Sequence, residues 1–204
     1  MDKYQMYIDG KFCDAESGAV LESINPANEE KIASFPKADL KDLEKAINSS
    51  RRAYDEGDWP KMTLQERGSY LIKIAQMIRE RAFELSQIET MDSGKTMKQT
   101  TFIDIPVSAN AFEYFASAAG EVKGETLTIP APAMSYTLRE PVGVVGAITS
   151  WNYPFLMAAW KIASSLILGN TVVFKPSKET SLSSLELAKI IDKCELPKGV
   201  VNFV

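Results

Sequence analysis

The chain has 204 residues, of which 45% are apolar and 25% are charged, and its formal net charge is −4. This is an ordinary composition for a globular protein. Since no basic patch dominates, nucleic acid is not an expected partner. No apolar stretch has the length of a membrane-spanning helix, so no membrane association is expected. The chain contains no histidine, which excludes Ser-His-Asp hydrolysis, Cys-His proteolysis and His-ligated metals from within it.

The two cysteines, Cys13 and Cys194, are far apart and neither belongs to a CxxC pair. A zinc site or a disulfide framework is therefore not indicated. The N-terminal sequence lacks the continuous apolar core of a secretory signal. A reducing, cytoplasmic location is expected.

The first 35 residues indicate short strands and turns. Asp9-Gly10 is a hairpin signal between two apolar pieces, and Asn25-Pro26 marks a second turn. Asp39 can cap a following helix. Its expected inner face consists of Leu40, Leu43 and Ile47.

Two more helices are predicted in the next 60 residues. Thr63 and Glu66 form a capping box that opens a long helix, expected to end near Asp92-Ser93-Gly94, where glycine can adopt the left-handed closing conformation. A third helix is expected from about 101 to 119, before Gly120. The apolar stripe of the long helix is Leu64, Leu71, Ala75, Ile78 and Leu85.

After Gly120 the hydrophobic period changes. Segments 125–130 and 135–140 alternate with period two around a proline-containing loop and predict a β-hairpin. Then follow an apolar strand (142–149), a helix from about Pro154, a strand (171–174), a helix capped near Ser183 with Glu186 three residues on, and a strand at 199–204. This β-α-β-α-β order predicts a parallel sheet in an α/β fold.

The sequence stops on its third apolar strand, whereas a doubly wound sheet normally has more strands. We therefore expect the N-terminal portion of a longer protein. A complete small domain with a three-stranded sheet is the alternative.

Residues 92–96, DSGKT, resemble the tail of a phosphate-binding loop. Such a loop would need glycine where Glu89 stands, and it would follow a strand rather than a long helix. We therefore interpret this segment as a helix end with Gly94 in a turn.

The stretch SWNYP (150–154) comes directly after the apolar strand, which contains Gly143 and Gly146 but no complete GxGxxG pattern. Open α/β sheets bind ligands at the carboxyl ends of their strands, and Pro154 suits the first turn of a helix. Asn152 therefore lies on a strand-to-helix elbow. Its amide could stabilise an oxyanion, or it could simply cap the helix.

Two further groups have both a structural and a functional interpretation. Tyr153, Met157 and Trp160 share a helix face, which could be core or the wall of a substrate channel. Lys175 ends the second strand on the ligand side and could bind ribose or phosphate, or be a solvated lysine before the Pro176 turn.

Together these segments resemble the N-terminal half of the NAD(P)-dependent aldehyde dehydrogenase family. The resemblance covers essentially the whole chain, and the order of SWNYP and LGNTVVFKPS is its most specific feature. The matching segments are 141–177, INPANEE (24–30), WPKMTLQER (59–67), ETMDSGK (89–95) and GVVNFV (199–204).

The resemblance implies a fold: the N-terminal part of a Rossmann-like parallel-sheet cofactor domain, with preceding helices and an oligomerisation β-hairpin. The implied divisions are 1–124 (strands and helices), 125–140 (hairpin) and 141–204 (incomplete NAD(P)-binding segment). The full-length protein is expected to be a homo-oligomer, either a dimer or a tetramer.

The resemblance also implies a reaction. A cysteine thiolate attacks an aldehyde, an asparagine amide and the backbone N–H of that cysteine hold the oxyanion, hydride passes to NAD or NADP, and a glutamate base assists thioester hydrolysis. Asn152 matches the oxyanion asparagine, and Lys175 matches the lysine that contacts the adenosine ribose. The strand end that lines the cofactor cleft is matched by Ile148, Thr149, Ser150 and Trp151, and the substrate tunnel by Tyr153, Met157 and Trp160.

The chain departs from the family pattern at two points. Lys178 stands where the family usually has a glutamate that repels a 2′-phosphate, so NADP could be accepted by charge attraction, unless Glu179 restores the NAD contact. The nucleophilic cysteine and the glutamate base belong to later family segments, and Cys13 and Cys194 do not match the nucleophile. The chain alone is therefore expected to be inactive.

Two details of the resemblance concern ligands. Tyr153 and Trp160 resemble part of the aromatic box of betaine-aldehyde-type enzymes, which attracts a quaternary ammonium. Asp104 matches a carboxylate near the family's structural monovalent-cation site, or it is an exposed first-turn residue of the third helix. A non-catalytic module that assembles through the hairpin is the alternative function.

Overall fold

The computed structural model describes residues 2–204. Its strands are β1 (Asp2–Lys3), β2 (Met6–Ile8), β3 (Lys11–Cys13), β4 (Val20–Ile24), β5 (Lys31–Pro36), β6 (Thr126–Leu127), β7 (Ser135–Tyr136), β8 (Val144–Ile148), β9 (Thr171–Lys175) and β10 (Val201–Phe203). Its α-helices are α1 (Leu40–Asp55), α2 (Leu64–Glu80), α3 (Ala82–Ser93), α4 (Met97–Gln99), α5 (Ile105–Ala118), α6 (Pro154–Ile167) and α7 (Leu182–Lys193). Two 3₁₀ turns, η1 (Trp59–Lys61) and η3 (Ala119–Glu121), and a π-helical turn, η2 (Thr100–Asp104), complete the chain.

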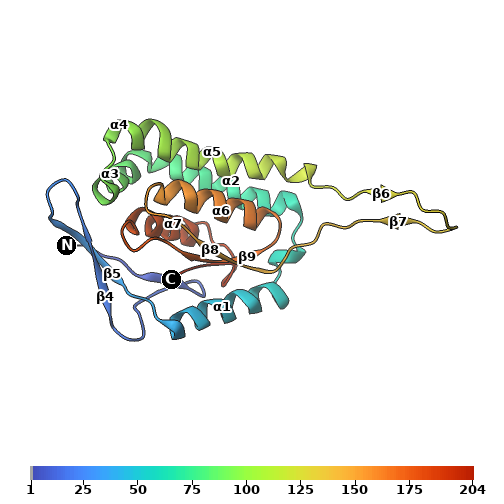
Figure 1. Ribbon diagram of the computed structural model, residues 1–204, viewed down its shortest axis with the longest axis horizontal. Helices are drawn as coiled ribbons and strands as arrows, with labels where there is room; N and C mark the ends of the chain where they lie inside the picture. Colours follow the sequence, from blue (N-terminus) through green and yellow to red (C-terminus); the bar gives the residue numbers. More distant parts are fainter. Residues whose placement is uncertain (1) are drawn as a thin grey trace.

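The central sheet has the strand order β3-β2-β10-β9-β8. Strands β8, β9 and β10 are parallel, which confirms the predicted β-α-β-α-β unit. Helix α1 covers one face of this sheet, while α6 and α7 cover the other and are backed by α2 and α5 (Figure 1). Since helices cover both faces, the side chains of Val172, Phe174 and Phe203 are fully buried.

The Asp9-Gly10 hairpin is confirmed, because β2 and β3 pair antiparallel around it and both turn residues have positive φ. This is the conformation that a two-residue hairpin requires. Its place in the fold was not predicted. Strand β2 also pairs antiparallel with β10 and so extends the central sheet.

The cap of α1 is confirmed, but its predicted inner face is confirmed only at Leu43, which packs against the core, and is wrong for Leu40 and Ile47. Asp39 and Asp42 form a reciprocal capping box. The side of the helix that is buried carries small and polar residues such as Ala46 and Ser50, because α1 packs closely against the sheet there. Leu40 is instead 76% exposed, and with Ile47 it borders an open groove.

The predicted long helix is two helices. The Thr63 capping box and the Gly94 left-handed stop are both confirmed. The helix is interrupted at Arg81, whose guanidinium binds Glu84 and reaches Glu186 on α7 at 2.5 Å. The interruption lets α3 pack against α7. Because Glu186 is committed to this ion pair, the predicted Ser183/Glu186 cap of α7 is wrong.

Helix α7 is capped from another part of the chain. Its N-cap residue, Ser181, makes no side-chain cap hydrogen bond. The Leu182 N–H instead donates to the buried carboxylate of Asp92 at 2.9 Å, and Asp92 also accepts a hydrogen bond from Ser23. One carboxylate thus joins the end of α3 to the start of α7.

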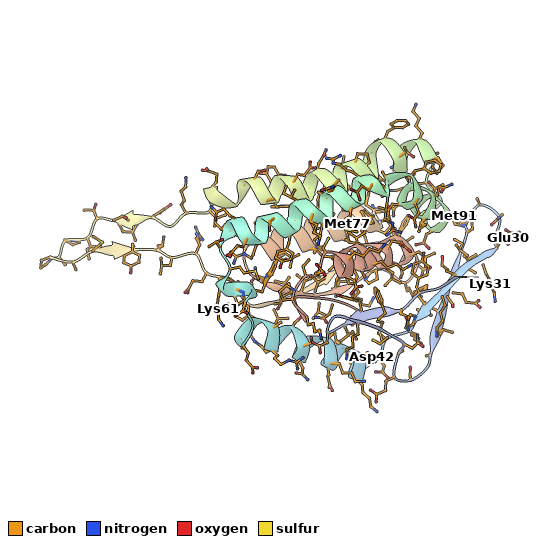
Figure 2. All side chains as sticks on the ribbon, turned by 180° about the vertical axis from the view of Figure 1, so that it is seen from behind. Glu30, Lys31, Asp42, Lys61, Met77 and Met91 are labelled. Atoms are coloured by element: carbon orange, nitrogen blue, oxygen red, sulfur yellow. The ribbon has the colours of Figure 1, made fainter. Side chains whose placement is uncertain are left out.

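The predicted hairpin pairs over only two residues on each strand, β6 with β7, and projects far from the body (Figure 1). Side chains fill the space between the helices and the sheet, whereas those of the hairpin lie in the open (Figure 2). Among residues 2–204, no helix is both long enough and apolar enough to cross a membrane.

Candidate active site

The elbow lies at the carboxyl end of β8. Residues 149–153 follow the strand, and α6 begins at Pro154. Asn152 is exposed, and its Oδ1 accepts a hydrogen bond from the Ser150 hydroxyl at 2.6 Å. The amide nitrogen therefore points away from Ser150. The N-cap residue of α6 is Tyr153, with no side-chain cap hydrogen bond, so the helix-cap interpretation of Asn152 is wrong.

Hydrogen bonds from Thr180, just before α7, and from Ser184 in its first turn hold the elbow on both sides of Asn152. Thr180 donates its hydroxyl to the Trp151 carbonyl at 2.9 Å, and Ser184 donates to the Pro154 carbonyl at 3.3 Å. The elbow backbone is therefore fixed by the segment that follows β9.

A groove of about 760 Å³ lies between α1 and strands β8 and β9 of the sheet. It contains Ile148 and Lys175, which are register partners on β8 and β9. Gly146 lies on its floor, and nothing stands within 4 Å of a side chain added there. A ligand could thus approach the strand closely. Lys175 donates to the Pro176 carbonyl at 3.2 Å, which keeps its ammonium at the rim of the groove.

The other residues predicted for the cofactor differ in exposure. Ser150 and Trp151 are exposed at the elbow, while Thr149 is buried and its hydroxyl makes no hydrogen bond within residues 2–204. Lys178 shares a smaller cavity with Lys175. Its ammonium lies 3.4 Å from the carboxylate of Glu179, and both side chains are exposed.

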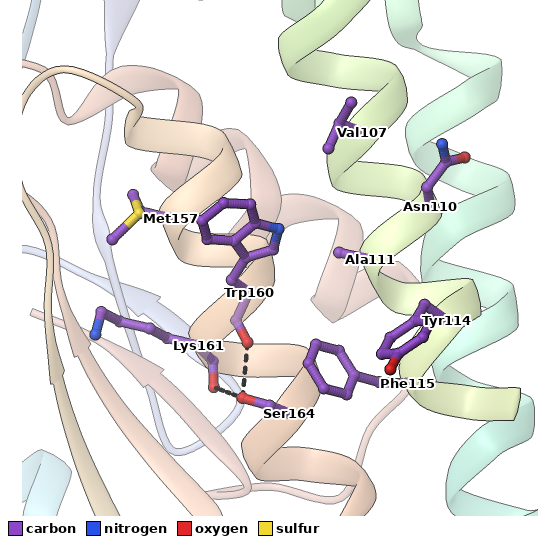
Figure 3. A pocket seen from close by; sticks show the side chains of 9 residues that line it. All are labelled: Val107, Asn110, Ala111, Tyr114, Phe115, Met157, Trp160, Lys161 and Ser164. Atoms are coloured by element: carbon purple, nitrogen blue, oxygen red, sulfur yellow. Dashed lines mark hydrogen bonds between the residues drawn. The ribbon is translucent and has the colours of Figure 1, made fainter. Parts of the chain in front are cut away.

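A second groove, of about 610 Å³, separates α5 from α6. Met157 and Trp160 both line it, as predicted for one helix face, and the Trp160 indole projects toward α5 (Figure 3). Tyr153 is not part of this lining. The sequence prediction did not include α5, which forms the other wall of the groove. Its lining residues are three and four positions apart, a spacing that places them on one helix face. They are Val107, Asn110, Ala111, Tyr114 and Phe115.

Tyr153 faces Lys95. The Lys95 ammonium lies 3.4 Å from the centroid of the Tyr153 ring and donates to Asp104 Oδ2 at 2.7 Å. Asp104 is 0% exposed, so the interpretation as an exposed first-turn residue is wrong. Since Lys95 already supplies the positive charge, the site does not fit a metal cation. Within residues 2–204, no three His, Cys, Asp or Glu residues are grouped to hold a metal ion.

Two more carboxylates are buried at the end of α3. Burial raises the pKa of Glu89 to about 7 and that of Asp92 to about 6. The hydrogen bonds from Ser23 and Leu182 partly offset the rise at Asp92. Ser183 and the Lys95 charge lower the pKa of Glu89, although neither Glu89 oxygen meets the geometry of a hydrogen bond in the described chain.

Neither thiol suits nucleophilic attack. Burial raises the pKa of Cys194 to about 11, and burial together with the Asp42 carboxylate also raises the pKa of Cys13. A nucleophilic cysteine has the opposite shift. That the reacting cysteine is neither of these two stays a prediction.

The aldehyde dehydrogenase family model matches residues 12–204. The chain is 42% identical to betaine aldehyde dehydrogenase of Bacillus subtilis, over 98% of this chain and 41% of that protein. It is 41% identical to aldehyde dehydrogenase family 2 member C4 of Arabidopsis thaliana, over 98% of this chain and 40% of the relative. The chain thus spans about two fifths of the length of these relatives.

Solved structures agree over the whole chain. An NAD⁺ complex of an aldehyde dehydrogenase from Bacillus cereus superposes with a TM-score of 0.96 at 37% identity, covering 100% of this chain and 41% of that one. A Staphylococcus aureus betaine aldehyde dehydrogenase superposes with a TM-score of 0.95 at 37% identity, covering 98% of this chain and 41% of that one. The mixed α/β fold with a Rossmann-like parallel sheet is therefore that of the N-terminal parts of these enzymes, and the chain belongs to the aldehyde dehydrogenase family.

Proposed function

We propose that this chain is the N-terminal portion of an enzyme that oxidises an aldehyde to a carboxylate with NAD or NADP. Its part is to supply the oxyanion donor Asn152, one wall of the cofactor cleft and one wall of the substrate groove. The observation that carries this proposal is the exposed Asn152 amide. Its oxygen is committed to Ser150, so its N–H₂ group is available at the carboxyl end of β8.

The proposed chemistry uses a cysteine thiolate that Cys13 and Cys194 do not provide. The sulfur bonds to the carbonyl carbon, and the carbonyl electron pair moves to oxygen, where the Asn152 amide donates a hydrogen bond. When bound, the nicotinamide accepts the hydride that leaves this carbon. Water then replaces the sulfur and yields the carboxylate. Because Asn152 stabilises charge that develops in the transition state, its hydrogen bond should raise kcat and leave KM nearly unchanged.

The experiment uses the longest native reading frame and follows NAD(P)H formation. Asn152→Ala should lower kcat about 10²- to 10³-fold with little change in KM. Asn48→Ala, at an exposed position of α1, is the matched control and should leave kcat unchanged. An Asn152→Ala enzyme with full kcat would refute the assignment, and the 204-residue chain alone should be inactive.

Two substrate classes are favoured by different observations. Trp160 and the similarity to betaine aldehyde dehydrogenase favour a quaternary ammonium aldehyde. The apolar groove of Met157, Tyr114 and Phe115 favours an aliphatic aldehyde. Since Tyr153 already has the Lys95 ammonium on its ring, the aromatic box lacks one predicted member. Comparing kcat/KM for betaine aldehyde and propanal separates the two classes.

We further propose that NADP is accepted together with NAD, because Lys178 lies near the rim lysine Lys175. Glu179 pairs with Lys178 and partly balances its charge. Lys178→Glu should raise the kcat/KM ratio of NAD over NADP. An unchanged ratio would exclude Lys178 from cofactor choice.

The projecting hairpin is the proposed self-association element, in a dimer or a tetramer. Its exposed apolar side chains include Leu127, Met134, Tyr136 and Leu138. Such a row of unpaired apolar residues is typical of an interface. The longest reading frame should therefore be oligomeric by light scattering and become monomeric when 125–138 is replaced by a short glycine linker.

A further inference from the structure

Resting on the proposed function, we propose that Lys95 is a positioning residue of the active site. Its ammonium, held by the buried carboxylate of Asp104, binds the ring of Tyr153 and thereby fixes the peptide that carries Asn152. Lys95 neither touches the proposed reacting atoms nor lines the substrate groove.

Geometry is the first argument. The Lys95 side chain is 13% exposed and lies between Asp104 Oδ2, at 2.7 Å, and the Tyr153 ring centroid, at 3.4 Å. A cation on an aromatic face is attracted by the ring quadrupole, and the attraction is stronger when both groups are desolvated. Tyr153 comes directly after Asn152, so a restraint on its ring acts on the neighbouring peptide.

Lys95 and Asp104 both lie next to irregular backbone, a left-handed glycine and a π-helical turn. Lys95 follows Gly94, which ends α3 with φ 74°. Asp104 ends the π-helical turn η2, where the Ile105 N–H bonds to the Thr100 carbonyl. Thr100 is also tied to Thr90 on α3 by a hydroxyl contact of 2.8 Å. A π-turn inserts a residue into a helix and is frequent at functional sites. In this chain the last residue of the π-turn is Asp104, whose carboxylate binds Lys95.

The charges around Lys95 make a purely structural ion pair a poor explanation. A buried ion pair seldom stabilises a fold more than apolar residues of similar volume would. Asp104 Oδ1 has no hydrogen bond within residues 2–204, so the pair is incompletely satisfied. The Lys95 ammonium is directed at the ring of Tyr153 on the elbow. A positioning role accounts for a pair that stability alone would not maintain.

The Tyr153 contact completes the restraint of the elbow. The carbonyls of Trp151 and Pro154 accept hydrogen bonds from Thr180, just before α7, and from Ser184 on α7. The Asn152 oxygen is held by Ser150. Tyr153 has neither helical nor extended backbone angles and makes no side-chain cap bond. The Lys95 contact adds a restraint on its side chain from a third direction.

The first test needs no activity and uses the 204-residue chain. In NMR spectra of labelled lysine, the Lys95 Hε resonances, assigned with Lys95→Arg, should lie upfield because of the Tyr153 ring current. They should return to ordinary positions in Tyr153→Leu and stay upfield in Tyr153→Phe. The Asn152 side-chain amide, assigned with Asn152→Ala, should shift in Lys95→Met/Asp104→Asn but not in Lys73→Met. Unshifted Asn152 resonances in the double variant would overturn the proposal.

The second test uses the longest native reading frame. Lys95→Met/Asp104→Asn removes both charges, so neither remains buried alone. It should lower kcat about tenfold while each KM stays within about twofold. Adding Tyr153→Leu should cause no further loss, because both changes remove the same restraint. An unchanged kcat overturns the inference. If the wild-type frame is inactive, the proposed function fails, and the NMR test still decides the role of Lys95.

Discussion

Replacing Glu89 by glutamine should remove much of the pH dependence of the chain's stability. Glu89 is fully buried on α3, and burial raises the pKa of its carboxyl from 4.5 to about 7. In the unfolded chain the group has its ordinary pKa. The folded state therefore holds a proton that the unfolded state releases as the pH rises from about 4.5 to about 7.

The sign and the size follow from linkage. Because the folded-state pKa is raised, the stabilisation is complete below about pH 4.5 and is lost as the pH rises through about 7. A difference of about 2.5 pKa units at 1.36 kcal/mol per unit gives about 3 kcal/mol, most of it lost between about pH 5 and about pH 8. Glutamine does not titrate, so Glu89→Gln should gain that amount relative to wild type over this interval.

Urea unfolding of the 204-residue chain, followed by circular dichroism across this pH range, measures the effect. Asp92 is present in both proteins, so its own contribution cancels in the difference, apart from its charge effect on Glu89. Glu44→Gln, at an exposed position of α1, is the control. Its free energy of unfolding should differ from that of wild type by the same amount at every pH. Parallel stability curves for wild type and Glu89→Gln would refute the buried, protonated Glu89.

Three further predictions concern stability and thiol chemistry. Gly94→Ala should lower the free energy of unfolding in urea by about 1–2 kcal/mol, because the φ angle of Gly94 is 74° and the added Cβ would lie 2.8 Å from a carbon of Pro26. The control is Gly18→Ala, which should lower it less, because φ is 69° there but the space around the added Cβ is open. Arg67→Met should cost about 3 kcal/mol, because the buried guanidinium donates to three backbone carbonyls, and an unchanged urea midpoint would contradict this. In the Cys13→Ser variant the remaining thiol is that of Cys194, whose pKa is about 11. At about pH 8 the folded variant should react with a thiol reagent about a hundredfold more slowly than the same variant unfolded in urea.

The elements that local patterns specify were predictable. The cap at Asp39, the capping box at Thr63, the left-handed stop at Gly94 and the hairpin turn at Gly10 depend on a few adjacent residues. The parallel unit was predictable because strands buried on both faces are continuously apolar. The elbow at Asn152 followed from that unit, since parallel strands present their carboxyl ends to ligands.

The wrong predictions concern interactions between distant segments. Arg81 interrupts the long helix because its partner Glu186 lies more than 100 residues away on α7. Asp92 replaces the predicted cap of α7 for the same reason. The inner face of α1 was assigned by hydrophobicity. The sheet instead accepts the small residues of that helix and leaves Leu40 exposed at the groove.

At the candidate active site, too, the local pattern was predictable and the contacts from distant segments were not. Asn152 was predictable by type and position, but a single amide on an exposed elbow would not by itself keep one orientation. The structure restrains it from three segments outside its own strand and helix: Thr180 and Ser184 on the side of α7, Lys95 after α3, and Asp104 before α5. None of these four residues follows from the pattern around SWNYP. Since an oxyanion donor contributes through its preorganisation, the chemistry proposed for Asn152 depends on residues that only the fold brings to it.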